Sequence, residues 1–433
     1  MSIAYDLFAA LSLSSMEAAT KTTSTAATAG GASRLILFLT VFIDLLGFGI
    51  VIPFLPLYAD RLGVGAAGIG LILASYSAAQ LVGAPILGRI SDRVGRRPVI
   101  MVGLLGSAVG YLIYGFATSF FWLVMSRAVH GICAATVSTA QAYIADTTEE
   151  SERAHGMGLI GAAFGLGFVL GPGLGGLLAY AGSSLPGFFA TDAGLRLPVF
   201  FASALALGNF FFAAKALPES HPNLGGLNLG LGELLEPWFN ITQNLHGILL
   251  RLFSLAFLFT FVFAGLETTF PLLAAGRYGL SPVGIGALFA FAGLLQAIAQ
   301  GYVLGKIVKR TGEWWLIRGG AIAMAVGLTP LVIGSSHLLL WILLALIAVG
   351  YGFSGPSVAS LISKSASRQL QGEALGVNQS ALSMARIFGP IIAGVLYEVV
   401  GAAWPYLGGT LIMLATLALM REKATASEGQ IAS

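Results

Sequence analysis

Charged side chains are scarce in this chain: Asp, Glu, Lys and Arg make up 9% of the 433 residues, whereas 57% are hydrophobic. A soluble domain carries about 25% charged residues, so the composition excludes a soluble protein. The net charge of +3 is small and the basic residues are dispersed, which argues against a nucleic-acid partner. We therefore expect an all-α integral membrane protein embedded in the lipid bilayer.

Cysteine is nearly absent as well. The single cysteine, Cys133, excludes a disulfide framework and a cysteine-based metal site. The five histidines are scattered, and the chain has no phosphate-binding loop and no Ser/His/Asp arrangement. We expect no metal, no cofactor and no enzymatic activity, which disfavours an ATP-driven pump or a membrane enzyme.

Long apolar runs, by contrast, fill the chain. A membrane helix needs about 20 apolar residues to cross a hydrocarbon core of about 30 Å. The sequence predicts twelve such spans, at residues 35–58, 69–90, 99–117, 120–143, 157–180, 196–216, 249–274, 283–308, 315–335, 338–363, 372–399 and 402–421.

The spans fall into two groups of six, separated by a segment rich in proline and glycine. The first 33 residues are rich in Ala, Ser and Thr and lack the basic start of a signal peptide, so we expect a disordered tail that starts at Met1 or Met16. The predicted organisation is a tail at 1–33, a six-helix bundle at 34–216, a linker at 217–247, a second six-helix bundle at 248–421 and a tail at 422–433.

Lysine and arginine predict the orientation of the spans. Of the 22 basic residues, three lie in loops on one side, two lie inside spans, and the other 17 lie on the opposite side together with both termini. Because cytoplasmic loops carry the excess of Lys and Arg, we expect both termini and the linker to be cytoplasmic.

A basic loop between spans two and three is repeated in the second half of the chain. The segment GRISDRVGRR, Gly88 to Arg97, matches LGKIVKRTGE, Leu304 to Glu313, at a constant offset of 217 residues. The glycines of the fifth span have a degraded copy around Gly389 in the eleventh. The second half is therefore a parallel copy of the first, and repeats of this kind are used by transporters for alternating access.

Four motifs resemble the major facilitator superfamily, in particular its twelve-helix drug:proton antiporter branch. These motifs are the loop Gly88-x3-Asp92-Arg93-x-Gly95-Arg96-Arg97, the segment DLLGFGIVIPFLP from Asp44 to Pro56, Arg127-x2-His130-Gly131, and Gly158-x8-Gly167-x3-Gly171-Pro172-x2-Gly175-Gly176. The resemblance implies two pseudo-symmetric bundles that rock about a central cavity. The fifth-span glycine motif resembles the antiporter signature, which favours export over uptake.

The resemblance also implies roles for these motifs. It places Asp92 at the start of helix eleven, near Gly372, where the loop arginines would tie the bundles together as a gate; a plain positive-inside anchor is the alternative for the arginines. It implies that helix five seals the outer half of the bundle interface. The first half is similar to tetracycline-efflux pumps, but Gly319 to Gly327 lacks their helix-nine acid and Gln296 replaces a helix-eight histidine.

Ionisable side chains inside spans are costly and usually functional, so they are the candidates for proton coupling. They are Asp44, Arg127, His130, Glu267 and Arg386. At about 1.5 Å per residue, Asp44 and His130 lie at a similar depth. We expect Asp44 to be a coupling carboxylate balanced by Arg127, with a static pair that fixes helix packing as the alternative.

The other candidates have open alternatives too. His130 is either functional or a hydrogen-bonded core residue. Glu267 either pairs with Arg386, meets cationic substrates, or is solvated at the outer interface. An apolar, aromatic cavity with few polar anchors would select substrates. Its candidates are Phe48, Gln80, Phe263, Gln296, Tyr351, Asn378 and Gln379.

These observations predict a monomeric, proton-coupled exporter of small amphipathic or drug-like compounds in the bacterial inner membrane. The first alternative is a symporter that takes up a sugar or an organic acid. The second is a transport-inactive membrane sensor or scaffold, against which the acids at Asp44 and Glu267 argue.

Overall fold

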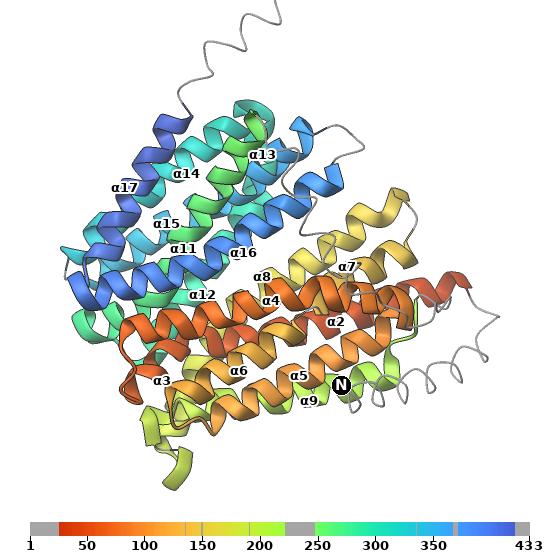
Figure 1. Ribbon diagram of the computed structural model, residues 1–433, viewed down its shortest axis with the longest axis horizontal. Helices are drawn as coiled ribbons and strands as arrows, with labels where there is room; N and C mark the ends of the chain where they lie inside the picture. The colour runs from red at the N-terminus through yellow and green to blue at the C-terminus, as the bar shows by residue number, and fades with distance from the viewer. Residues whose placement is uncertain are drawn as a thin grey trace, which may run out of the picture. The chain divides into compact units, whose positions relative to one another are not determined.

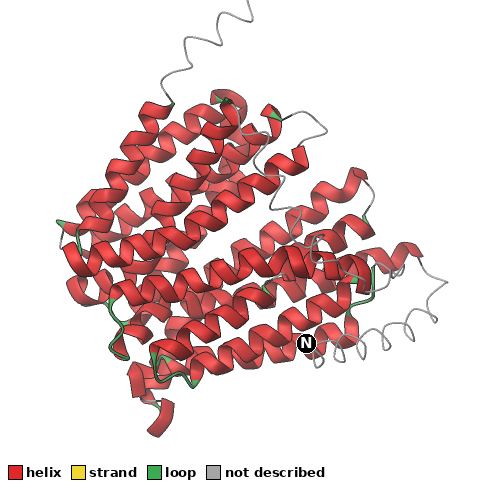
Figure 2. Cartoon of the chain, viewed as in Figure 1, coloured by secondary structure: helices red, strands yellow, loops and turns green. Residues whose placement is uncertain are grey.

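The backbone of the chain is built from long helices (Figure 1). The computed structural model describes residues 26–134, 136–148, 150–189, 191–220, 247–334, 336–366 and 371–420. In these ranges no strand occurs, and the helices are joined by short loops (Figure 2). Within this described part of the chain, eleven helical spans are long and apolar enough to cross a membrane, and Trp404–Leu419 is a shorter apolar helix. The predicted all-α membrane fold is thereby confirmed.

The helices of the first half are α2 (Ala26–Val51), η1 (Ile52–Phe54), α3 (Leu55–Arg61), α4 (Ala66–Val94), α5 (Arg96–Gly115), α6 (Phe120–Cys133), α7 (Thr136–Thr147), α8 (Glu150–Ser184), η2 (Gly187–Phe189), η3 (Thr191–Gly194) and α9 (Arg196–Ala216). The helices of the second half are α11 (Ile248–Tyr278), α12 (Pro282–Ile298), η5 (Ala299–Val303), α13 (Leu304–Thr311), α14 (Glu313–Leu328), η6 (Thr329–Val332), α15 (His337–Ser365), α16 (Gln371–Val395), η7 (Leu396–Val400) and α17 (Trp404–Leu419).

Several predicted spans consist of more than one helical element. The first span comprises α2, η1 and α3. It is divided because Pro53 has no backbone N–H to donate, and the helix tightens to a 3₁₀ turn at this residue. The eighth and eleventh contain π-helical segments, η5 and η7. Segments of this kind are frequent at functional sites.

The described chain divides into two compact units. Unit 1 comprises Met1–Ile52 and Ala78–Asn240, and unit 2 comprises Pro53–Ser77 and Ile241–Ser433. The start of α2 at Ala26 lies inside the predicted tail 1–33. Residues 1–25, residues 221–246 of the linker and the tail from 422 lie outside the described residues, so the predicted domain boundaries stay predictions.

Unit 1 is organised by a close crossing of α2 and α8. A Cβ atom built on Gly49 would lie 2.6 Å from the carbonyl oxygen of Gly167, and one on Gly171 would lie 2.6 Å from the carbonyl carbon of Gly49. At these distances a methyl group would not fit at either glycine, so the two helices are in direct backbone contact. Small residues permit such close packing of helices in membranes. Two glycines of the fifth-span motif thus face the first-span motif. Pro172, Gly175 and Gly176 are buried beside them.

Unit 2 contains the corresponding crossing of α11 and α16. A Cβ atom on Gly265 would lie 2.9 Å from the Cβ of Ala393, and one on Gly389 would lie 2.5 Å from the carbonyl oxygen of Phe261. Gly389 is the counterpart of Gly171 at an offset of 218 residues. The internal repeat seen in the sequence is therefore a repeat of helix packing.

The crossing in unit 1 predicts a difference between two glycines of one motif. Gly171→Ala should lower the free energy of unfolding by about 1–3 kcal/mol, because the methyl group overpacks the contact with α2. Gly158→Ala on the same helix is the matched control, since its Cβ would meet nothing within 4 Å. Thermal unfolding of the detergent-purified variants measures this, and equal melting temperatures would contradict the crossing.

Candidate functional site

In unit 1 the carboxylate of Asp44, on α2, lies against α5. Ser107 Oγ donates a hydrogen bond to Asp44 Oδ1 at 3.3 Å. Asp44 is half-buried and Ser107 is buried. Among the described residues Asp44 forms no ion pair, so its electrostatic coupling to Arg127 stays a prediction.

One face of α5 also holds the two basic candidates of α6. Tyr111 and Tyr114 follow Ser107 at spacings of four and seven residues, so all three side chains lie along one stripe. The Arg127 guanidinium lies 5.7 Å from the Tyr111 ring centroid and 5.4 Å from that of Tyr114. The His130 ring lies edge-on to Tyr111, at 4.7 Å between centroids. Both basic residues are buried, so aromatic rings replace water around them.

Phe48 joins this group from α2. Its ring lies 6.1 Å from that of His130 and 6.0 Å from that of Phe168 on α8, and both pairs are edge-on. Phe48 and Gln80 are half-buried. The structure therefore places Asp44, Phe48, Arg127 and His130 around the same stretch of α5, and their roles in coupling and in the substrate cavity stay predictions.

In unit 2 the aromatic candidates are in direct contact. The rings of Phe263 on α11 and Tyr351 on α15 stack at 4.0 Å between centroids, with an interplanar angle of 3°. The hydroxyls of Tyr351 and Thr260 lie 3.5 Å apart. This pair offers a flat apolar surface with a polar edge, which is the composition expected of a cavity wall.

The charged candidates of unit 2 lie beside this pair. Glu267 is one turn beyond Phe263 on α11, and Arg386 on α16 is close enough for its charge to act on both Glu267 and Tyr351. Glu267 and Arg386 are half-buried. Arg386 Nη2 also donates to Ser383 Oγ at 3.4 Å. The geometry brings Glu267 and Arg386 into one cluster, but no ion pair joins them within the described ranges.

The amide candidates differ in their positions. Gln296 lies on α12 against Gly352, the neighbour of Tyr351, where a Cβ would be 3.4 Å from Gln296 Cγ. Asn378 on α16 is 8% exposed, and its Oδ1 accepts no hydrogen bond from a described residue. Gln379 on α16 is exposed.

The basic loop of unit 1 is an ion cluster centred on Arg96, the first residue of α5. Its guanidinium pairs with Asp92. It also donates a hydrogen bond from Nη1 to Ser91 Oγ at 2.7 Å and one from Nε to Asp146 Oδ2 at 2.9 Å. Arg96 is buried, Asp146 on α7 is 23% exposed and Asp92 is 58% exposed. Asp92 therefore binds within its own loop here, and its placement at helix eleven stays a prediction.

The sharp turn at Gly95 has a φ of 102°, a conformation that favours glycine. Beyond it, Glu219 accepts hydrogen bonds from the backbone N–H groups of Arg96 and Arg97, at 2.8 and 3.1 Å. A carboxylate at this position stabilises the positive end of the α5 dipole. Arg97 also donates to the carbonyl oxygen of Ala214, so the end of α9 is tied to the start of α5. Gly88, by contrast, has open space around its Cβ position.

The copy of this loop in unit 2 keeps the glycine turn, but the acid and the base of the ion pair at the start of the next helix exchange places. Gly312 has a φ of 77°, and Glu313 begins α14 where Arg96 begins α5. Glu313 pairs with Lys364 on α15 and accepts a hydrogen bond from Ser360 Oγ at 3.1 Å. An acid thus occupies the position of Arg96, and a base lies close to the position equivalent to Asp146.

Sequence reasoning missed the residues that hold these groups in place. They are Ser107, Tyr111, Tyr114, Asp146, Glu219 and Thr260. A polar stripe at spacings of four and seven residues in an otherwise apolar span was the available signal for α5. Glu219 offered none, because its partners are backbone groups distant in sequence.

Two helical units with ionisable groups inside apolar spans define a multi-pass membrane transporter. The model of the Major Facilitator Superfamily matches residues 37–386, and the chain belongs to this family. The family consists of transporters, so the chain is not an enzyme.

Known relatives are similar over most of their length. The chain is 28% identical over 386 residues to Multidrug resistance protein 2 of Bacillus subtilis, covering 89% of this chain and 93% of that protein. It is 31% identical over 369 residues to Tetracycline resistance protein, class E, of Escherichia coli, covering 84% and 87%.

Solved structures agree on the fold. The human organic anion transporter MFSD10 is 27% identical with a TM-score of 0.65, and the match covers 90% of this chain and 99% of that one. The nucleoside transporter NupG is 13% identical with a TM-score of 0.68, covering 90% and 100%, a likeness that shows the fold alone.

The two acids that pair with Arg96 should differ in their contribution to stability. Asp146→Asn should lower the free energy of unfolding by about 1–3 kcal/mol, because it removes a charged partner from a buried guanidinium. Asp92→Asn should cost less than about 1 kcal/mol, because Asp92 is largely solvated. Denaturant titration of the two variants compares these losses, and an equal or larger loss for Asp92→Asn would contradict the assignment.

Proposed function

We propose that this protein exports small amphipathic or drug-like compounds in exchange for protons, by alternating access. It acts as a monomer in the bacterial plasma membrane, with both termini in the cytoplasm. Protons and the exported compound are its partners, and nucleic acid is not. Family membership and the similarity to a multidrug resistance protein and a tetracycline resistance protein support export.

The observation that carries the proposal is the environment of Asp44. A carboxylate within a membrane span is energetically costly, so one without a charged partner usually has a function. The partner of Asp44 is the Ser107 hydroxyl, which can donate to a carboxylate or accept from a carboxylic acid. Asp44 can therefore take up and release a proton without breaking an ion pair.

The unit 2 cluster supports an amphipathic substrate. The stacked rings of Phe263 and Tyr351 provide apolar surface, and Glu267 with Arg386 provides charge beside it. Tetracycline itself is disfavoured as the substrate, because the helix-nine segment Gly319–Gly327 has no acid and Gln296 stands for a histidine. A panel of compounds in susceptibility assays, with and without Asp44→Asn, tests the range.

Removal of the Asp44 charge should uncouple transport from protons. In proteoliposomes, Asp44→Asn should abolish export driven by a pH gradient but leave counterflow exchange of substrate, because the variant cannot exchange a proton yet still binds and moves substrate. The matched control is Asp192→Asn in η3, an acid outside the spans. The amide keeps an acceptor oxygen for Arg196, and Asn tolerates the φ of 55° at this position.

Two results would contradict this proposal. Unchanged pH-driven export by the Asp44→Asn variant would exclude Asp44 as the coupling group. Accumulation of the compound together with protons, in wild-type vesicles, would instead identify a symporter on the same fold.

The ring stack should contribute to substrate affinity. Tyr351→Ala removes one ring, and we expect about tenfold weaker binding of an aromatic substrate. Tyr351→Phe keeps the stack and loses only the hydroxyl near Thr260, so its affinity should stay within about twofold of wild type. Fluorescence binding with a dye substrate measures both, and similar losses in the two variants would indicate that the hydroxyl matters instead.

A further inference from the structure

Segment Pro53–Ser77 has an unusual place in the chain. It contains α3 and the first part of α4, and both of its ends continue into unit 1, yet its contacts assign it to unit 2. α3 packs against α11, with Leu57 lying on the large apolar core of unit 2. The first turn of α4 meets the end of α16 and η7.

This meeting is made by backbone contacts at glycines. A Cβ atom on Gly70 would lie 2.8 Å from the carbonyl carbon of Pro390, and one on Gly394 would lie 2.9 Å from that of Ala66. The two helices therefore touch without intervening side chains. A contact of this kind is either fully formed or broken, because even a small separation of the two backbones removes much of their van der Waals attraction.

The side chain of Glu398 ties the two helices together at this contact. Glu398, in the π-helical segment η7, accepts a hydrogen bond from the backbone N–H of Ala67 at 2.8 Å, and its carboxylate lies against Gly65. It thereby caps the positive N-terminus of α4 from another helix, an arrangement that stabilises both partners. The π-helical turn breaks the regular α-helical spacing of α16 at the residues that carry this carboxylate.

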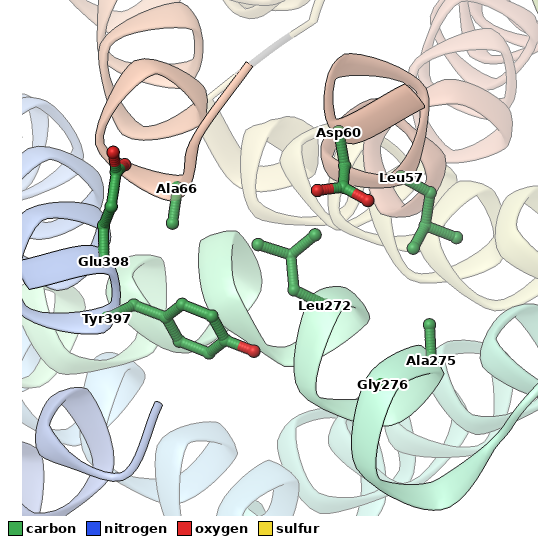
Figure 3. Close-up of a pocket in the computed structure, with 8 residues that line it drawn as sticks. All are labelled: Leu57, Asp60, Ala66, Leu272, Ala275, Gly276, Tyr397 and Glu398. Carbon is green, nitrogen blue, oxygen red and sulfur yellow. The ribbon is translucent and has the colours of Figure 1, made fainter. Parts of the chain in front are cut away.

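The fastened helices border a cavity of about 510 Å³. Figure 3 shows Ala66 and Glu398 on one side of it, with Tyr397, Leu272, Leu57 and Asp60 around the rest. Ala66 belongs to α4, whereas Tyr397 and Glu398 belong to η7, so separation of these two elements would widen the cavity. This end of α4 is opposite the Gly88–Arg97 loop, and the charge bias predicts that it faces away from the cytoplasm.

We propose that Glu398 is the latch of a gate at this end of the protein. It holds the start of α4 on η7 and thereby keeps the cavity narrow, and its release lets segment Pro53–Ser77 leave the rest of unit 2. Glu398 is a positioning residue of the transport cycle and not a substrate ligand. The proposal rests on alternating access but not on the identity of the substrate or of the coupling ion.

The gate is tested by distance measurement in the full-length protein. Arg61→Cys and Val399→Cys, both exposed, carry spin labels in a Cys133→Ser background, reconstituted in lipid nanodiscs. Pulsed electron paramagnetic resonance then reports the ratio of long to short distances. Glu398→Ala should raise this ratio about fivefold, the value of one helix cap. Gly70→Ala should raise it as well, by forcing the two backbones apart.

Two matched variants keep the test specific. Glu398→Gln retains an acceptor oxygen and should stay within about twofold of the wild-type ratio. Asp60→Asn removes an equal charge from the same cavity without touching α4 and should leave the ratio unchanged. Identical distributions in wild type and Glu398→Ala would overturn the latch, as would an equal rise in Asp60→Asn, which would indicate a general charge effect.

The measurement needs no substrate and no proton gradient. A positive result together with absent drug export would therefore leave the gate standing and remove the proposed function. Amide hydrogen exchange of the α4 start provides a second readout. Loss of protection over several residues after Ala67 supports release of the segment, whereas loss at the Ala67 amide alone contradicts it.

Discussion

Hydrocarbon offers no hydrogen bonds, and this constraint governs the whole chain. Every polar group within a span must find its partner inside the protein. The backbone meets the requirement by forming helices throughout the described residues, and the few charged side chains meet it in small clusters. Asp44 has the Ser107 hydroxyl, while Arg127 lies over two tyrosine rings. Burial of a charged side chain in a membrane span is energetically costly, so each of these few clusters is a candidate functional site.

The same constraint explains the glycine motifs. Without a hydrophobic effect between helices in lipid, tight association depends on close backbone contact. Gly49, Gly167 and Gly171 provide it in unit 1, and Gly265 with Gly389 provides it in unit 2. The motif that resembles the antiporter signature is thus first a packing device. It holds α2, the helix that carries Asp44, in close contact with α8.

The two units share geometry but differ in chemistry. Both use a glycine with positive φ between a basic helix end and the next helix, and both anchor that helix start by an ion pair. The pair is Arg96 with Asp146 in one unit and Glu313 with Lys364 in the other. The acid of unit 1 has a hydroxyl partner, whereas Glu267 of unit 2 has a cationic neighbour in Arg386. A duplicated scaffold therefore carries two chemically unequal halves.

The sequence by itself determined the class of the protein, because apolar runs and the placement of charge reflect the membrane directly. It also determined the internal repeat and the candidates Asp44, Arg127, Glu267 and Tyr351, since ionisable and aromatic residues stand out in apolar spans. Only the tertiary structure decided which side chains hold them. Ser107 reaches Asp44 across 63 positions of sequence, Glu219 caps α5 across more than 120, and Glu398 reaches Ala67 across 331. These partners come together because helices distant in sequence pack against each other, and the local sequence does not show which helices will do so.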